Sequence, residues 1–300
     1  MEEQRSALTT TASRRGSDVL DWARERLEAA GIPWAVGDSE IILAHTLGLR
    51  REDVQAGAAA EVELTEDQFE TVRDFVDRRA TKREPLQLLT GRAFFRDLVI
   101  EVGPGAYIPR RETETVAQLA IDAIRASGNE HPVVIDVGAG VGPIGLAIAT
   151  EIPGSTVHLV ELVDETYEWL ARNVATIAPG NAHAVHGDML EVLPELFGRV
   201  DVIAANSPWV PDDVESPTPE VELWTVDRHL HGGGADGMDL MRALSKRAMR
   251  WIRPGGVWVE EHGISQAPVV RALFEADGWL DVTSHIDRMG RERVTTARRP

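Results

Sequence analysis

The chain has 300 residues, and 43% of them are hydrophobic, enough to bury a core in each of one or two globular domains. Its 49 acidic residues outnumber the 31 basic ones, which gives a formal net charge of −18. Because non-specific nucleic-acid binding relies mainly on Lys and Arg, we expect no nucleic-acid partner without a local basic patch. The absence of cysteine excludes disulfides, zinc–thiolate sites and cysteine nucleophiles, and we expect no metal site.

The sequence lacks the patterns of export and of membrane insertion. Residues 1–16 have no apolar core of the kind found in signal peptides, and no stretch approaches the roughly 18 apolar residues of a membrane span. We therefore expect a cytoplasmic protein without a membrane partner. We also expect residues 1–16 to form a flexible N-terminus.

Residues 17–84 have a helical pattern throughout, with apolar residues that recur at the spacing of one helix face. Three helices are expected to begin at or near Ser17, Asp38 or Ser39, and Thr65. Thr65 and Gln68 have the spacing of a capping box, Gly31 lies where a left-handed cap of the first helix is expected, and the second helix is expected to lie before Gly48. The segment therefore predicts a small helical domain.

The pattern changes after this domain. Residues 85–109 contain short extended runs with Gly and Pro, which predict a hairpin and a turn that connect two domains. From His131 onward, apolar strands alternate with helices, which predicts an α/β fold with a doubly wound, mostly parallel sheet. The last two extended segments could add an antiparallel pair at one edge. We assign residues 110–300 to this second domain.

An acidic, proline-rich stretch at 211–222 precedes a run of glycines. Its composition alone is typical of a solvated surface loop. Its position directly after a strand favours a loop over the active site, because ligands of open α/β sheets bind beyond the carboxyl ends of the strands. The sequence leaves both interpretations open.

The first candidate site follows the first strand of the sheet, in the run from Asp136 to Gly142. Glycines there allow a close approach of the backbone to a ligand, and the following helix offers free N–H groups. The run Gly140 to Gly145 also fits the dinucleotide pattern GxGxxG. However, Gly138 already closes the strand, and the carboxylate of Asp136 at its tip would repel a pyrophosphate but pair with the cationic part of S-adenosylmethionine. A plain tight turn is the alternative.

Two further acidic residues are expected at strand ends. Glu161 ends the second strand, where a carboxylate can accept hydrogen bonds from both hydroxyls of a ribose. Folds that bind NAD and folds that bind S-adenosylmethionine both use this device, so it selects neither. Asp188 ends the third strand and could accept a hydrogen bond from an adenine amino group, or it could be a solvated carboxylate.

The third candidate is the run Asn206, Ser207, Pro208 and Trp209, at the end of an apolar strand. Pro208 removes a backbone donor and stiffens the turn, which leaves the side-chain oxygen of Asn206 and nearby carbonyls as acceptors beside an aromatic face. Such a turn could receive a planar group that bears an NH2. The alternative is a structural β–α turn with a partly buried Trp.

Together these features resemble the HemK/PrmC family of protein-(glutamine-N5) methyltransferases, which modify peptide chain release factors. The resemblance spans nearly the whole chain: residues 83–91 with Phe95 are similar to the family's connector, and 107–114 to its IPRPxTE signature. Residues 136–142 resemble its DxGxGxG loop, and 206–209 lie where the family has NPPY. Residues 219–239 resemble its PEV…GGxDGLD pattern, and 290–294 its tail.

The resemblance implies a class I, Rossmann-like methyltransferase domain preceded by a helical domain, residues 17–84, for substrate recognition. It implies S-adenosylmethionine as cofactor, a protein substrate such as a release factor, and an acceptor site at Asn206, Ser207, Pro208 and Trp209. The cofactor-binding residues that it implies are Phe95, Arg110, Thr113, Glu114, Asp136, Gly138, Ala139, Gly140, Gly142, Glu161, Leu162, Asp188, Met189 and Asn206.

Ser207 and Trp209 depart from NPPY, and Arg111 departs from the proline of IPRPxTE. Ser207 and Trp209 leave methylation of a small biosynthetic metabolite open as an alternative. Methylation of adenine in a nucleic acid is another, because similar turns hold flipped bases, and binding without turnover is a third. We expect catalysis mainly by positioning of the acceptor nitrogen, with no base before transfer. Glu261 or His262 could accept the proton afterwards, although a structural role suits each of them better.

Overall fold

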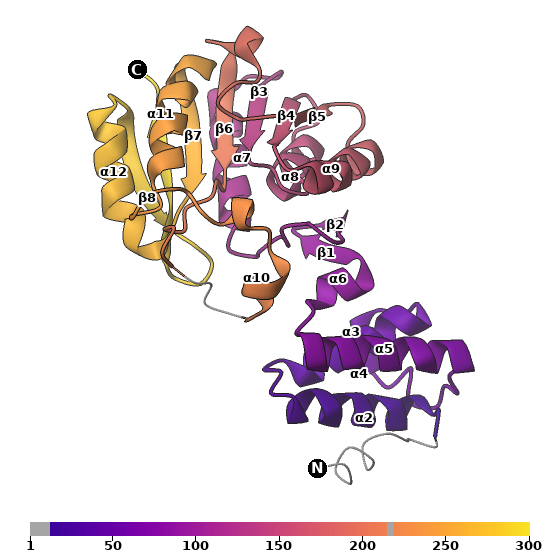
Figure 1. Ribbon diagram of the computed structural model, residues 1–300. Coiled ribbons are helices and arrows are strands. Elements are labelled where there is room, and N and C mark those ends of the chain that lie inside the picture. Colours follow the sequence, from indigo (N-terminus) through magenta and orange to yellow (C-terminus); the bar gives the residue numbers. More distant parts are fainter. Residues whose placement is uncertain (1–12, 215–218) are drawn as a thin grey trace. The chain divides into compact units, whose positions relative to one another are not determined.

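The computed structural model describes residues 13–214 and 219–300. Residues 1–12, within the predicted flexible N-terminus, and residues 215–218, within the predicted acidic loop, lie outside the described residues. The described chain forms two compact units, each with its own core (Figure 1).

The first unit is helical and consists of the chain up to Gly91 and a later stretch that ends at Trp224. Its helices are α2 (Gly16–Ala29), α3 (Ala35–Leu47), α4 (Arg51–Gln55), α5 (Glu66–Lys82), α6 (Leu86–Thr90) and the separate α10 (Pro219–Trp224). Apolar residues of the first helices share one buried core that includes Val19, Leu43 and Val76. The predicted capping box at Thr65 is present, and Gly31 and Gly48 have the positive φ angles expected of helix C-terminal caps.

Helix α3 begins at Ala35, so the prediction of a start near Asp38 or Ser39 was wrong. Asp38 looked like a cap because short acidic residues favour helix N-termini. In the structure Asp38 lies inside the first turn, where it is buried and accepts a hydrogen bond of 2.8 Å from Arg79 Nε of α5. A tertiary ion pair therefore explains this residue, which sequence pattern alone could not show.

Helix α10 was not predicted, and it belongs to the helical unit although it comes late in the chain. Glu220 of α10 pairs with Arg79 Nη1 at 3.1 Å and with Arg83 Nη2 at 3.0 Å. Trp224 Nε1 donates a hydrogen bond of 3.0 Å to the carbonyl of Lys82. These contacts attach α10 to the C-terminal end of α5.

The second unit begins at Arg92 with the predicted hairpin, β1 (Arg92–Phe95) and β2 (Leu98–Glu101). Alternating strands and helices follow: α7 (Glu114–Ser127), β3 (Val133–Val137), α8 (Pro143–Glu151), β4 (Thr156–Glu161), α9 (Asp164–Ile177), β5 (Ala182–His186), β6 (Val200–Ala205), α11 (Asp239–Trp251), β7 (Ile252–Glu261), α12 (Ala267–Ala276), β8 (Leu280–Ile286) and β9 (Glu292–Arg298). Short 3-10 turns lie at Pro194–Leu196, Asp227–His229 and Ile264–Gln266. Helix α7 was missed.

The seven-stranded sheet has the order β5-β4-β3-β6-β7-β9-β8. Neighbouring strands from β5 to β7 are parallel, and β9 pairs antiparallel with both β7 and β8, as the predicted edge pair requires. The strand order reverses at β3, whose neighbours are β4 and β6. In open α/β sheets this switch point is where ligands bind, beyond the carboxyl ends of the strands.

Helices cover both faces of this sheet (Figure 1). On one face, Ile135, Ile203 and Trp258 pack in one core with α11 and α12, which contribute Leu244 and Phe274. Every residue of β6 is buried, as expected for a central strand covered on both faces. The fold is therefore a class I, Rossmann-like α/β fold with a helical unit before it, as the sequence predicted.

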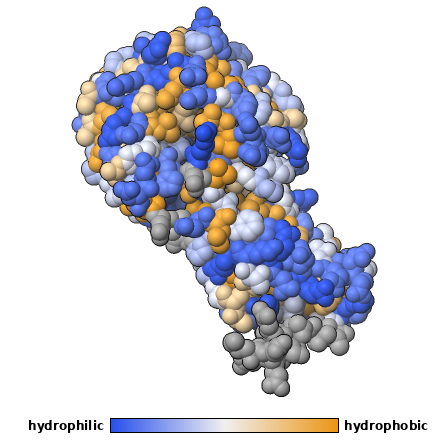
Figure 2. Space-filling view, in the orientation of Figure 1, coloured by the Kyte–Doolittle hydropathy of each residue, from blue (hydrophilic) through white to orange (hydrophobic). Residues whose placement is uncertain are grey.

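Hydrophilic residues surround smaller hydrophobic patches on the surface shown in Figure 2. Isolated exposed apolar side chains, such as Phe94 with 72% exposure, are ordinary on a protein surface. Within the described residues, no helix combines the length and apolar character that crossing a bilayer requires.

Candidate active site

The glycine-rich loop joins β3 to α8 at the switch point. Gly138, Gly140 and Gly142 have φ angles of +65°, +57° and +94°, which residues with a Cβ adopt only under strain. A Cβ on Gly142 would lie 2.8 Å from Leu170 Cδ1 and 2.9 Å from Leu146 Cδ1. These glycines let the backbone turn sharply into the N-terminus of α8. Ala139, between the first two, is almost fully buried.

Asp136 lies under this loop and is fully buried. Its Oδ2 accepts a hydrogen bond of 2.7 Å from the N–H of Gly145, but its Oδ1 has no hydrogen-bond partner among the described residues. Burial raises the pKa of Asp136 to about 7, and the negative charge of Glu161 acts in the same direction. A buried carboxylate oxygen without a donor is suited to a cation or a donor of a ligand.

Glu161 ends β4 and is also buried. Its Oε2 accepts from the N–H of Gly140 at 2.9 Å, and its Oε1 accepts from the N–H groups of Leu162 and Val163 at 2.9 and 2.8 Å. Burial raises the pKa of Glu161, but His229 and the N–H of Val163 outweigh burial and hold this pKa below its usual value. The carboxylate is therefore ionised and fixed against the glycine loop.

Asp188 and Met189 follow β5 on the same edge of the sheet. Asp188 Oδ1 accepts a hydrogen bond of 2.8 Å from the N–H of Leu190. A Cβ on Gly138 would lie 3.5 Å from Met189 Cε and 3.9 Å from Ser207 Cα. The loop after β5, the glycine loop and the turn after β6 therefore meet at one place.

The turn after β6 carries Asn206, whose Nδ2 donates to Thr113 Oγ1 at 3.3 Å. This contact orients the amide of Asn206 from outside its own element, because Thr113 precedes α7. Both residues are on the predicted site, Asn206 in the acceptor turn and Thr113 in the signature at 107–114. The structure brings them together next to the glycine loop.

Ser207 is fully buried and is held from the neighbouring strand β7. Its hydroxyl donates to Glu260 Oε1, and its N–H lies 3.4 Å from the same oxygen. Glu260 Oε2 accepts from Trp258 Nε1 at 2.9 Å. Burial raises the pKa of Glu260 to about 8, against the hydrogen bonds from Ser207 and Trp258. Sequence reasoning missed Glu260, although two consecutive acidic residues in an apolar strand were a signal.

Trp209 is contacted from β9 and from the turn before α12. The guanidinium carbon of Arg293 lies 5.4 Å from the centre of the indole, within cation–π range. Gln266 Nε2 donates to the Trp209 carbonyl at 2.8 Å. A Cβ on Gly263 would lie 3.1 Å from Trp209 Cε3. Pro208 stands between Ser207 and Trp209, so both neighbours of this proline are fixed.

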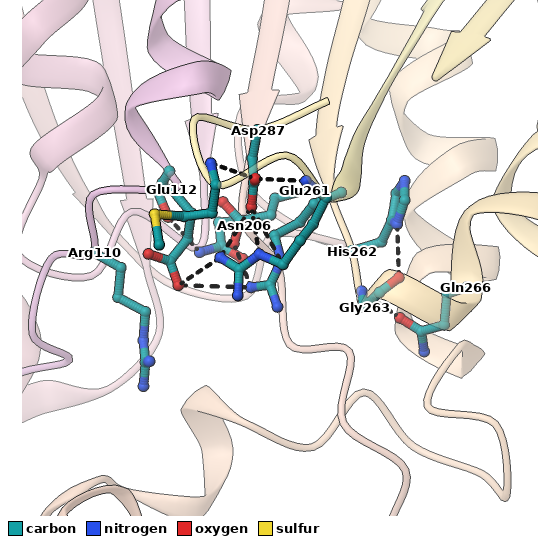
Figure 3. Close-up of polar contacts among 12 residues, drawn as sticks. Arg110, Glu112, Asn206, Glu261, His262, Gly263, Gln266 and Asp287 are labelled. Atoms are coloured by element: carbon teal, nitrogen blue, oxygen red, sulfur yellow. Dashed lines mark hydrogen bonds and ion pairs between the residues drawn. The ribbon is translucent and has the colours of Figure 1, made fainter. Parts of the chain in front are cut away.

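A group of charged side chains lies beside Asn206 (Figure 3). Arg293 Nη1 lies 3.5 Å from Glu261 Oε1 and 3.8 Å from Glu112 Oε1. Burial raises the pKa of Glu261 to about 7, against a hydrogen bond from Thr113 and the charge of Arg293. Its Oε2 is buried and has no hydrogen-bond partner among the residues that the structure describes. Glu261 is therefore adjacent to the predicted site.

Both ring nitrogens of His262 have hydrogen-bond partners within the fold. Its Nδ1 lies 3.0 Å from the carbonyl of Gly263, and its Nε2 lies 2.8 Å from Thr295 Oγ1. Because a carbonyl only accepts, Nδ1 carries the proton in the neutral ring. Burial lowers the pKa of His262. Both nitrogens are therefore used within the fold.

Two predicted cofactor residues, Arg110 and Glu114, have partners within the protein, and a third, Phe95, is buried. Phe95 is buried in β1. Arg110 Nε donates to Tyr107 Oη at 2.9 Å. Glu114 Oε1 accepts from the N–H of Arg96 at 3.0 Å, and Glu114 Oε2 lies 2.6 Å from Arg288 Nη1. A role of these residues in cofactor binding stays a prediction.

Comparisons with known proteins identify relatives of the whole chain. The model of the PrmC N-terminal domain matches residues 18–91, and that of the methyltransferase small domain matches 109–235. Release factor glutamine methyltransferases of Bifidobacterium longum and Streptomyces coelicolor are each 39% identical, over 94% and 92% of this chain and 98% and 95% of their own. The 4-amino-L-phenylalanine/4-methylamino-L-phenylalanine methyltransferase of Streptomyces pristinaespiralis is 31% identical over 92% of both chains.

The parallel sheet, its switch point and the glycine loop over a buried carboxylate define a class I methyltransferase. The similarity to release factor glutamine methyltransferases extends through both units. The chain therefore belongs to the HemK/PrmC family of release factor glutamine methyltransferases.

Proposed function

We propose that this methyltransferase transfers the methyl group of S-adenosylmethionine to the side-chain amide nitrogen of a glutamine in a protein such as a peptide chain release factor. The observation that carries the proposal is Asn206, held by Thr113 beside the glycine loop. An asparagine amide in this place can pair with the amide of a glutamine. The names of the relatives that match over most of the chain support the same substrate.

The residues at the switch point fit this cofactor. Asp136 Oδ1 is a buried acceptor that needs a positive or donating partner, and the cofactor carries an ammonium and a sulfonium. Glu161 is an ionised carboxylate at the strand end where a ribose is expected. Asp188 and Met189 follow the next strand. When bound, the cofactor supplies a methyl group on a positively charged sulfur.

The protein's own residues position the acceptor. An amide nitrogen is a poor nucleophile because its lone pair is delocalised into the carbonyl group. We propose that Asn206 Oδ1 and the carbonyl of Ser207 accept hydrogen bonds from the acceptor NH2. Such positioning can be worth up to about 7–11 kcal/mol in well-oriented reactions. We further propose that residues 206–209 replace the NPPY turn of the family, with Ser207 anchored by Glu260.

The proton of the acceptor nitrogen becomes acidic only after transfer, so no base has to act before it. Of the two candidate acceptors for this proton, His262 has both ring nitrogens engaged. Glu261 has a buried oxygen without a partner among the described residues and a pKa near 7. Glu261 is therefore the better of the two. The helical unit would recognise the protein substrate, as the assignment of residues 17–84 predicts.

The substitution Asn206→Ala tests the proposal. We expect methyl transfer to a release factor to fall at least about 100-fold in kcat, because the lost contacts act on the acceptor in the reacting complex. Calorimetry should give a cofactor Kd within a few-fold of the wild type. A release factor whose glutamine is changed to Ala is the control for the site of labelling. Near-normal turnover by the variant would refute the role of Asn206.

A second candidate is N-methylation of a small aromatic amine. It is favoured by the indole of Trp209, backed by Arg293, and by the relative from Streptomyces pristinaespiralis. A planar amine could stack on the indole, a contact worth roughly 1–3 kcal/mol by analogy with bases on aromatic side chains. The two candidates differ in the size of the acceptor, and Trp209 therefore distinguishes them.

Wild type and Trp209→Tyr should both be assayed with labelled S-adenosylmethionine on a release factor and on 4-amino-L-phenylalanine. For a glutamine acceptor, we expect transfer to the release factor by both proteins within about 10-fold of each other, since either ring can stack on an amide. If the wild type methylates only the amine, and Trp209→Tyr slows that reaction, the second candidate is established and the first is refuted.

A further inference from the structure

His229 lies against the carboxylate of Glu161, in a segment that no predicted site included. It ends the 3-10 turn Asp227–His229, and only 9% of its side chain is exposed. Its Nε2 lies 3.2 Å from Thr166 Oγ1 and 3.8 Å from Glu161 Oε1. The edge of the ring contacts Tyr107, with 6.1 Å between ring centres. The imidazole is therefore fixed beside the acidic end of β4.

The hydrogen bonds of Thr166 determine which nitrogen of His229 carries the proton. Thr166 Oγ1 donates its single hydrogen to the carbonyl of Gly105 at 2.8 Å, so it can only accept from His229 Nε2. In the neutral ring, Nδ1 is then an acceptor. This Nδ1 is buried and has no hydrogen-bond partner among the described residues. Buried acceptors of this kind are normally satisfied.

We propose that His229 is a second ribose ligand beside Glu161, with its Nδ1 accepting a hydrogen bond from one of the two ribose hydroxyls. This inference rests on the proposed use of S-adenosylmethionine. Among the residues that the structure describes, Glu161 Oε2 accepts one hydrogen bond, from the N–H of Gly140, which leaves a lone pair for a ligand. An ionised carboxylate that ends β4 and an imidazole whose other nitrogen lies 3.8 Å from that carboxylate suit a ligand with two adjacent donors. A vicinal diol has this chemistry, and a phosphate, which only accepts, does not.

The backbone next to His229 is hydrogen-bonded to the acceptor turn. The carbonyl of Leu230 accepts from the N–H groups of Trp209 and Val210, at 3.1 and 2.8 Å. Val210 and His231 also form an isolated parallel β-bridge. A ligand bound at His229 would therefore lie next to the backbone that holds Trp209.

Calorimetry with S-adenosylhomocysteine tests the assignment without turnover. Loss of one hydrogen bond from a neutral group predicts a rise in Kd of up to about 10-fold for His229→Ala. His229→Asn keeps a side-chain acceptor near the position of Nδ1 and should recover part of the affinity. The matched control is His231→Ala, two residues away, which removes a contact of 3.2 Å with the carbonyl of Pro211 and should leave Kd within twofold.

Analogues of S-adenosylhomocysteine that lack the 2′- or the 3′-hydroxyl identify the contact. If His229 binds one hydroxyl, the penalty of His229→Ala disappears for the analogue that lacks it and persists for the other. The proposal is overturned if wild type binds and His229→Ala binds equally well, or if the penalty is the same for all three ligands, which would indicate a structural role. No binding by wild type would refute the proposed cofactor as well.

Discussion

Four buried acids surround the glycine loop and the acceptor turn: Asp136, Glu161, Glu260 and Glu261. Burial acts to raise the pKa of each of them. Asp136 and Glu161 could be predicted from the sequence, because Glu161 ends an apolar strand and Asp136 is one residue from the end of another. The hydrogen bond between Ser207 and Glu260, in contrast, could not be predicted from the sequence. The two residues are 53 positions apart, and only the pairing of β6 with β7 places them side by side.

The first prediction concerns the pH dependence of cofactor binding. Asp136 has a pKa of about 7, so it loses its charge as pH falls through 7, while the α-amino group of the cofactor stays protonated below about 7.7. We expect the Kd of S-adenosylmethionine to rise up to about 10-fold from pH 7 to pH 6. Asp136→Asn should bind weakly with little pH dependence in calorimetry. Glu261→Gln, which removes another group with a pKa near 7, should keep the dependence.

The second prediction concerns stability. The pKa of Glu260 is raised from 4.5 to about 8 in the folded protein, so between these pH values the folded state holds a proton that the unfolded state has lost. Stability should therefore fall as pH rises through this window, by at most about 1.4 kcal/mol per pH unit from this group. Glu260→Gln removes this contribution.

In urea unfolding, the free energy of unfolding of Glu260→Gln relative to wild type should increase by roughly 2 kcal/mol between pH 5.5 and 7.5. The control is Glu292→Gln on the exposed surface of β9, which should differ from wild type by the same amount at both pH values. A difference between Glu260→Gln and wild type that does not change with pH would contradict the prediction.

At the scale of the element, features that depend on neighbouring residues could be predicted, and features that depend on contacts between distant residues could not. The capping box of α5 depends on residues three positions apart, and the sequence predicted it correctly. Helix α3 begins after Trp34 without a side-chain cap, and α7 begins after Thr113, whose hydroxyl accepts from Asn206 and makes no cap. The start of α3 was therefore misplaced and α7 was missed. The strand order depends on pairing between distant segments, which the alternating pattern does not contain.

The third prediction concerns the start of α5. Thr65 Oγ1 accepts from the N–H of Gln68, and Gln68 Oε1 accepts from the N–H of Thr65. Thr65→Ala should lower the free energy of unfolding by about 1 kcal/mol. Thr71→Ala is the control in the same helix, where the hydroxyl bonds the carbonyl of Asp67, and it should change stability by less than about 0.5 kcal/mol. Equal effects in chemical unfolding would argue against a cap.

At the scale of the whole molecule, the chain enters the helical unit twice. It forms α2 to α6 first, and it returns with α10 after the acceptor turn. The proposed assignment of substrate recognition to residues 17–84 omits this second passage. No pattern in the sequence predicted it, because Glu220 and its partners Arg79 and Arg83 are about 140 positions apart.

The fourth prediction concerns α10. Glu220→Gln removes the ion pairs with Arg79 of α5 and with Arg83 directly after it, which are partly shielded from solvent and together worth about 1 kcal/mol. Amide hydrogen exchange in residues 219–224 should become several-fold faster, and the KM for a release factor should rise. Glu222→Gln, at an exposed position of the same helix, is the control and should change neither. Unchanged exchange in Glu220→Gln would show that the ion pairs do not hold α10.

Because two separate stretches of the chain form the helical unit, this unit cannot be exchanged between relatives as one continuous segment. A chimera that takes residues 13–91 from a relative and the rest from this chain would join the foreign α5 to the native α10. Glu220 would then face whatever residues the relative has in place of Arg79 and Arg83, and Trp224 would lose its fitted position at Lys82. The helical unit of this protein is thus made of two separate stretches of sequence. Evolution or an engineer can exchange this unit intact only by moving both stretches together.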